Sequence, residues 1–227
     1  MAVVKSLHIN NYSKGKWTEF SNPMAQLLVN KKNKIPLYIP DPTQLSLKDT
    51  DRLKVNGWKK IFHASGNQKR IELFMSDKID FKSKMVIRDK EGHYIMIKGS
   101  TQQEDITIVN MYAPNSTAPK YIKQTPTDLK GEKNNTVIAG DFNTPLLAMD
   151  QSPRQKNEQG NVGLEPYFRS MDLTHIYRTF HPTSAEYTFF SSMHRTSSRT
   201  GHVSHKTSLS KFKKTQIIPS IFSDQSV

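Results

Sequence analysis

The sequence predicts a single layered domain of the α/β or α+β class. Segments with the alternating or β-branched composition of strands recur along most of the chain, and a few helix candidates stand between them. Residues 136–140 form a continuous apolar run, which is typical of a strand buried on both faces of its sheet. No internal repeat or clear linker interrupts residues 1–227, so we expect one domain.

The N-terminal part is predicted to be less regular than the rest. Residues 7–10 alternate apolar and polar side chains, like a short half-buried strand. Residues 11–47 have the weakest pattern, with a candidate helix start at 24–30 and a candidate strand at 35–39. Because Pro36 has no backbone N–H, we expect that strand at the edge of a sheet.

The later elements are better defined by their patterns. Strands are predicted at residues 58–63, 71–75, 93–99, 105–112, 136–140, 187–190 and 215–218. The turn residues at 99–105 are predicted to join two of these strands as a hairpin. Helices are expected within 118–131, where Pro126 interrupts the pattern, and within 160–174, ending near Met171.

The charge of the chain points to a polyanionic partner. The net charge is +13, from 33 Lys and Arg against 20 Asp and Glu, and each phosphate that a protein neutralises releases a counterion. Between Glu186 and Asp224 there is no acidic residue, whereas Arg195, Arg199 and several lysines lie there among histidines and aromatics. We predict that this interval faces a nucleic-acid backbone, with Arg195 and Arg199 as contacts. Charge that serves only solubility is the alternative.

The composition also excludes several classes of site. Cysteine is absent, which excludes a disulfide framework, a thiolate zinc site and a cysteine nucleophile. No apolar run approaches the length of a membrane span, and the first residues lack the apolar region of a signal peptide. We therefore expect a nuclear or cytoplasmic monomer that does not interact with membranes.

The segment after the apolar strand is the strongest candidate for chemistry. Gly140 is followed by Asp141 and Asn143, and an i, i+2 spacing in extended chain places both side chains on one side. A carboxylate and a carboxamide together can orient a water and hydrogen-bond a phosphoryl oxygen, as phosphodiester hydrolysis requires. The alternative is an ordinary turn, where Asp and Asn are common.

A second polar group ends the strand predicted at 105–112. The hydroxyl of Tyr112 can donate to a developing oxyanion, although a buried core tyrosine is the commoner role for a tyrosine in a strand.

Several ordered motifs resemble the endonuclease/exonuclease/phosphatase superfamily. They are Asn-Met-Tyr-Ala-Pro-Asn at 110–115, Gly-Asp-Phe-Asn-Thr-Pro at 140–145 and Glu-Tyr-Thr-Phe-Phe-Ser at 186–191. More closely, the chain resembles the apurinic-endonuclease-like domain at the start of the second open reading frame of mammalian long interspersed retrotransposons, with further matching text at 89–100 and 172–182. The resemblance runs from Lys48 to Val227, and residues 11–47 carry almost none.

This resemblance implies a fold and an activity. The implied fold is a four-layer α/β sandwich, in which two packed mixed β-sheets are flanked by helices. We expect it to be incomplete in the N-terminal third, where residues 11–47 diverge, and at the C-terminal edge. The implied activity is Mg²⁺-dependent hydrolysis of a DNA phosphodiester. In the retrotransposon proteins, which are fused to a reverse transcriptase, it nicks target DNA.

The resemblance also implies roles for single residues. Asp141 matches the aspartate that orients the attacking water, Asn143 the asparagine beside it, and Tyr112 the tyrosine that contacts the phosphate. The implied metal-region residues are Asn10, Asp224 and, as a shorter substitute for the family's glutamate, Asp41. The implied DNA contacts are Thr188 and Ser223.

Three departures from the family's motifs predict impaired catalysis. His8 replaces the first asparagine of the opening motif, Gly201 replaces an aspartate, and Gln225 replaces the catalytic histidine of the closing Ser-Asp-His motif. Glutamine cannot take up a proton near neutral pH, whereas histidine can. Loss of a general acid–base group typically costs about 10²–10⁴-fold in rate.

Three interpretations of function follow. The first is a Mg²⁺-dependent DNA endonuclease-like domain with impaired catalysis. The second is an inactive basic pseudoenzyme that binds DNA, or RNA. The third is a retrotransposon relic without a function.

Overall fold

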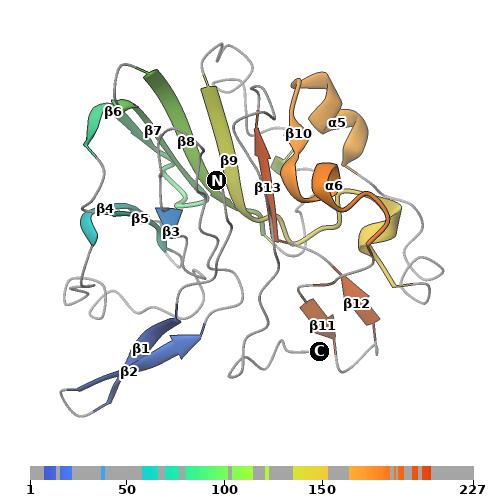
Figure 1. The fold of residues 1–227 in the computed structure, drawn as a ribbon, viewed down its shortest axis with the longest axis horizontal. Helices are drawn as coiled ribbons and strands as arrows, with labels where there is room; N and C mark the ends of the chain where they lie inside the picture. The colour runs from blue at the N-terminus through green and yellow to red at the C-terminus, as the bar shows by residue number, and fades with distance from the viewer. Residues whose placement is uncertain are drawn as a thin grey trace.

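The computed structural model describes a strand-rich domain with few helices (Figure 1). The described residues are 8–13, 16–21, 37–38, 58–65, 70–76, 80–101, 104–114, 121–122, 135–152, 164–184, 187, 189–191, 196–198 and 201–205. Among these residues, no helix is long and apolar enough to cross a membrane.

A six-stranded mixed sheet forms the centre of the described structure. Its strands, in spatial order, are β10 (Thr174–His175), β13 (Gly201–His205), β9 (Asn135–Asp141), β8 (Glu104–Tyr112), β7 (Tyr94–Thr101) and β6 (Phe81–Arg88). The β8–β9 pair is parallel and the other pairs are antiparallel. Consequently β6, β8 and β9 run in the same direction, and their last residues lie at the same end of the sheet.

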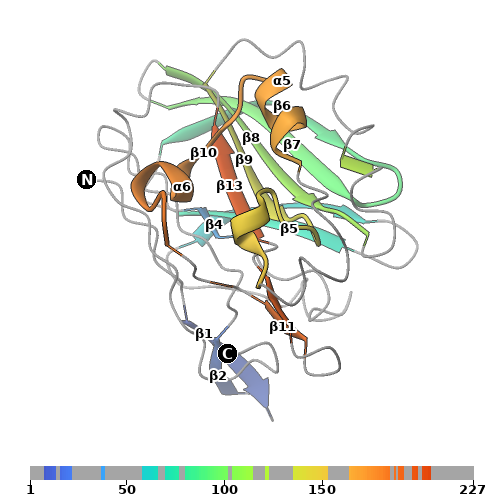
Figure 2. The same cartoon turned by 90° about the vertical axis from the view of Figure 1, so that its right-hand side faces the viewer.

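A smaller sheet lies beside it. Its order is β3 (Leu37–Tyr38), β5 (Arg70–Ser76) and β4 (Trp58–Ser65), all antiparallel. Figures 1 and 2 both show β4 and β5 as a layer separate from β7 and β8. The strand predicted at 35–39 is thus confirmed as a short edge strand, as the proline before it requires.

Apolar side chains from both sheets pack between them. Members of this inter-sheet cluster include Ile71, Leu73 and Met75 of β5, Ile95 and Ile97 of β7, Ile108 and Tyr112 of β8, and Val137 and Ala139 of β9. They recur at every second position, as expected for one face of a strand. Burial of such a side chain is worth roughly 1.5–3 kcal/mol, so this cluster fixes how the two sheets meet.

The opposite face of the large sheet is covered by helix and loop. The helix-side cluster contains Met96, Val109, Met111 and Ile138 from the sheet, and Phe142, Leu146, Leu164 and Phe168 from the segments that cover it. Phe168 lies on α5 (Glu165–Ser170), and its ring meets Phe142 edge to face at 5.6 Å between centroids. Both faces of β8 and β9 are therefore buried, as the continuous apolar run predicted.

Most predicted elements of the central region are confirmed. The hairpin of β7 and β8 has Thr101 opposite Glu104, so its connection is shorter than expected. The strands predicted at 58–63, 71–75 and 136–140 are β4, β5 and β9. The helix predicted within 160–174 is α5, and Met171 is its C-cap. The strand predicted at 187–190 is shifted to β11 (Phe189–Ser191), which pairs with β12 (Thr196–Ser198).

Other elements were not predicted. β6 was not predicted because most of its residues are exposed and its pairing with β7 shifts in register between Ser83 and Met85, so its sequence lacks a regular alternation. The helix α6 (Ile176–Phe180) is too short for a clear helical period. The strand predicted at residues 7–10 is confirmed as β1 (His8–Ser13), which pairs with the unpredicted β2 (Lys16–Ser21) in a separate two-stranded sheet within the segment of weakest pattern (Figure 1). The strand predicted at 215–218, the helix start at 24–30 and most of the helix at 118–131 lie outside the described residues.

A buried ion pair ties α6 to the segment that follows β9. Asp150 is fully buried at the end of the 3-10 turn η1 (Ala148–Asp150), and Arg178 of α6 is 8% exposed. The Nε and Nη2 atoms of Arg178 both donate to Oδ1 of Asp150, while Oδ2 accepts the backbone N–H of Leu147 at 3.0 Å. Each carboxylate oxygen is thereby satisfied, as a buried charge requires.

Breaking this pair from one side is expected to destabilise the domain. Asp150→Ala and Arg178→Met each leave a buried charged partner uncompensated, so each should lower the free energy of unfolding by about 3–5 kcal/mol. The double variant should lose less than the sum of the two, because neither charge is then left alone. Urea unfolding monitored by circular dichroism measures all three values.

An exposed pair supplies the matched control. Arg169 of α5 pairs with Glu165 at 2.6 Å, and its side chain is 78% exposed. Arg169→Met should therefore change the free energy of unfolding by no more than about 0.5 kcal/mol. If Arg169→Met and Arg178→Met cost the same, the buried pair does not have the role assigned to it.

Candidate active site at the ends of β8 and β9

The site is built where the two parallel strands end side by side. Tyr112, the last residue of β8, is in register with Asp141, the last residue of β9. The backbone N–H of Ala113 donates to the carbonyl oxygen of Asp141 at 2.9 Å, which continues the pairing one residue further. The predicted catalytic residues on the two strands are therefore neighbours.

Gly140 allows this close approach. It has a φ of 148°, and a Cβ atom added there would lie 1.8 Å from the carbonyl oxygen of Met111 on β8. No side chain fits such a contact, so the glycine before Asp141 is required by the backbone of the neighbouring strand. Only the glycine itself marks this requirement in the sequence.

Asp141 and Asn143 come together through a turn, so the expectation of an extended chain was wrong. Asn143 has a φ of 45°, in the left-handed region that asparagine tolerates better than most residues. Oδ1 of Asp141 accepts the backbone N–H of Asn143 at 2.9 Å, as in an Asx-turn. Nδ2 of Asn143 donates to the carbonyl oxygen of Ala113 at 2.8 Å and so ties the turn back to β8.

Tyr112 is a core residue at the candidate site. Its side chain is 5% exposed and belongs to the inter-sheet cluster, so the core role weighed for it in the sequence is confirmed. Asn110, two residues earlier on the same face of β8, is also buried. Its place in an otherwise apolar strand is the only sign in the sequence of this buried polar side chain.

The other neighbour of β9 supplies a glycine to the site. Gly201, the first residue of β13, is in register with Asp141, and His202 with Gly140. Gly201, where the resemblance implies an aspartate, is therefore directly across from Asp141. β13 also corrects the expected surface between Glu186 and Asp224, because part of that interval is an inner strand of the sheet.

The remaining predicted site residues are not brought together by the described structure. Asn10 lies on β1, in the separate two-stranded sheet. Arg195 and Arg199 flank β12 in the sequence but are themselves outside the described residues. Asp41, Thr188, Ser223 and Asp224 are outside them as well.

Comparison with known proteins supports the fold. No model of a known protein family matches the sequence. An AP endonuclease from Leishmania major is similar in structure, with a TM-score of 0.58 and 13% identity, over 76% of this chain and 70% of that chain. A TDP2 from D. rerio, humanized by 14 mutations, has a TM-score of 0.51 and 10% identity, over 75% and 70%. The chain has the endonuclease/exonuclease/phosphatase fold.

The motifs that resemble the superfamily imply Mg²⁺ as a cofactor. Mg²⁺ prefers six oxygen ligands and is usually held by one or two carboxylates with waters. Within the described ranges, no three His, Cys, Asp or Glu residues gather in a group that could hold a metal. Among the described residues, Asp141 is the carboxylate at the ends of β8 and β9, and its Oδ1 accepts the backbone N–H of Asn143. The described residues by themselves do not fit a complete Mg²⁺ site.

What these residues offer chemically is one carboxylate held in a fixed orientation beside an amide and a phenol. A carboxylate can orient a water and accept its proton, and the amide nitrogen of Asn143 carries a second N–H besides the one used on Ala113. A general acid for the leaving oxygen is not found among the described residues at these two strand ends.

A side chain at position 140 would test the close contact between β8 and β9. Gly140→Ala forces β8 and β9 apart and is expected to lower the free energy of unfolding by about 2–5 kcal/mol. Urea unfolding measures the loss, and Ser83→Ala on the exposed β6 is the control, with an expected change below about 0.5 kcal/mol. An unchanged stability of Gly140→Ala would contradict the close approach of the strands.

Proposed function

We propose that this chain is a Mg²⁺-dependent DNA endonuclease-like domain whose cleavage of phosphodiester bonds is impaired. The observation that carries the proposal is the register of Tyr112 with Asp141, with Asn143 locked beside them by two hydrogen bonds. The same residues match the catalytic motifs of the superfamily in sequence. The similarity in fold to an AP endonuclease supports a nuclease rather than a purely structural domain.

The motifs of the chain resemble the nicking domain of long interspersed retrotransposons most closely, so target-site nicking is the activity from which it would derive. A four-layer sandwich, in which a further helical layer covers β3, β4 and β5, is part of the same proposal. DNA is the expected partner, in keeping with the net charge of +13.

Impairment follows from the replaced residues. Gln225 offers no group that changes protonation near neutral pH, and Gly201 places no side chain opposite Asp141. Losses of an acid–base group and of metal ligands each cost orders of magnitude in rate, although the costs are not additive. A second candidate function is therefore a basic pseudoenzyme that binds DNA without cutting it.

Plasmid nicking distinguishes the two candidates. Supercoiled plasmid is incubated with the full chain and Mg²⁺, beside EDTA and two variants, Asp141→Ala and Asp141→Asn. Asp141→Asn keeps an oxygen that can accept the N–H of Asn143 but removes the charge, so it tests the carboxylate without removing the turn. We expect weak relaxation, at least about 10²-fold below a competent nuclease, that is lost with either variant and with EDTA.

The exposed Asp172 gives a matched control. It has a φ of 57°, which asparagine also tolerates, so Asp172→Asn should leave both stability and nicking unchanged. Nicking that survives Asp141→Ala would point to a contaminating nuclease. Complete absence of nicking in a folded chain that binds DNA, with affinity falling steeply as salt rises, would favour the pseudoenzyme.

A further inference from the structure

The turn between β6 and β7 lies at the same end of the sheet as the candidate site. β6 runs parallel to β8 and β9, and the turn follows its last residue, Arg88. The carbonyl oxygen of His93, at the far side of the turn, accepts the backbone N–H of Tyr112 at 2.8 Å. The turn is therefore next to β8 in the row of strand ends that leads to Asp141.

The distance between the turn and Asp141 follows from the spacing of the strands. Neighbouring strands are about 4.8 Å apart, so two steps across the sheet separate His93 from Asp141 by about 10 Å. Along a DNA duplex, this corresponds to roughly three base pairs at about 3.4 Å each. A duplex bound at Tyr112 and Asp141 would thus pass the turn if it lay across the sheet ends.

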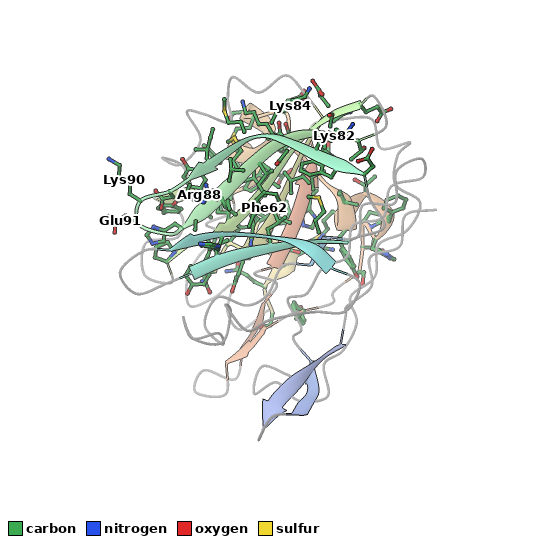
Figure 3. All side chains as sticks on the ribbon, turned by 90° about the vertical axis from the view of Figure 1, so that its left-hand side faces the viewer. Phe62, Lys82, Lys84, Arg88, Lys90 and Glu91 are labelled. Atoms are coloured by element: carbon green, nitrogen blue, oxygen red, sulfur yellow. The ribbon has the colours of Figure 1, made fainter. Side chains whose placement is uncertain are left out.

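The turn has a fixed shape and an exposed tip. The N–H of Asp89 donates to the carbonyl oxygen of Tyr94 at 3.1 Å, and Gly92, with a φ of 75°, donates to that of Asp89 at 3.2 Å. One carboxylate oxygen of Asp89 accepts the N–H of His93 at 2.9 Å. This bond engages one oxygen of the Asp89 carboxylate inside the turn, and Lys90 and Glu91 are exposed at the tip (Figure 3).

A second cation stands at the base of the turn. Nε of Arg88 donates to the backbone carbonyl oxygen of His63 on β4 at 2.8 Å, so its guanidinium bridges the edges of the two sheets. A carbonyl is neutral, so this bond leaves the charge of Arg88 in place beside the turn. The turn and its base carry the cations of Arg88 and Lys90 and the carboxylates of Asp89 and Glu91, and of these Lys90 and Glu91 lie at the exposed tip.

We infer that the tip of the β6–β7 turn lies against the phosphate backbone of DNA bound at the candidate site. Lys90 attracts the backbone and Glu91 weakens the same contact. The inference rests on the proposed function, because it requires a duplex at Tyr112 and Asp141. It adds a second point of contact, which orients the duplex across the ends of β8, β7 and β6.

The alternative role for these charges is protection of a sheet edge. Lysines on an edge strand discourage pairing with another chain. Lys84 fits that role, since it pairs with the exposed Asp105. Lys82 lies on the same strand as Arg88 but roughly 20 Å further from the turn, and it is likewise exposed (Figure 3). Lys82 is therefore a control for charge that is remote from the site.

Binding of a short fluorescent duplex, measured by anisotropy in EDTA over a range of salt concentrations, tests the inference. Lys90→Gln should weaken binding about three- to tenfold at low salt and reduce the slope of log K against log salt by about 0.9. Glu91→Gln should tighten binding by a similar factor, because it removes a repulsion. Lys82→Gln should change affinity less than about twofold.

The outcomes separate the inference from the function on which it rests. Opposite signs for Lys90→Gln and Glu91→Gln, with Lys82→Gln near the parent, support contact at the turn. Equal weakening by Lys82→Gln and Lys90→Gln, or no tightening by Glu91→Gln, overturns the contact while binding by the parent chain upholds the DNA-binding proposal. Absence of binding by the folded parent chain at the lowest salt overturns both.

Discussion

The close approach of β8 and β9 at Gly140 is the constraint on which the rest of the candidate site depends. Because the carbonyl oxygen of Met111 occupies the place of a Cβ atom, the two strands can meet only if that residue is glycine. Their register then puts Tyr112 beside Asp141, and the bonds of Asn143 to Asp141 and Ala113 close the turn. The packing of the two backbones thus determines where the polar groups of the candidate site lie.

Burial on both faces holds this arrangement in place. The inter-sheet cluster presses on one side of β8 and β9, and the helix-side cluster on the other. The buried pair of Asp150 and Arg178 then joins the segment after the site to α6. A chain can lose polar residues around such a scaffold and still keep its fold, which is consistent with a recognisable architecture at 13% identity to the Leishmania major enzyme.

The sequence predicted those parts whose pattern reflects burial. β9 was evident because both of its faces are covered, and β3 was placed at an edge by the proline before it. β6 was missed because an exposed edge strand needs no apolar alternation, and β13 because a strand in a polar, basic stretch has no such pattern. The pairing of Asp141 with Asn143 was expected for the wrong geometric reason, since a left-handed residue cannot be inferred from spacing. The ion pair of Asp150 with Arg178 depends on contacts between distant segments, which local patterns do not contain.

The mixed pairing of the large sheet has a kinetic consequence. β9 reaches its parallel neighbour β8 only after the chain between residues 112 and 135 has crossed over, and its other neighbour, β13, is supplied from residues 201–205. Closing such long segments costs entropy before any contact repays it, so pairings of this kind form slowly. The strand ends that carry Tyr112, Asp141 and Gly201 are thus assembled after local hairpins such as β7–β8. During synthesis, the local hairpins therefore form before the candidate site does.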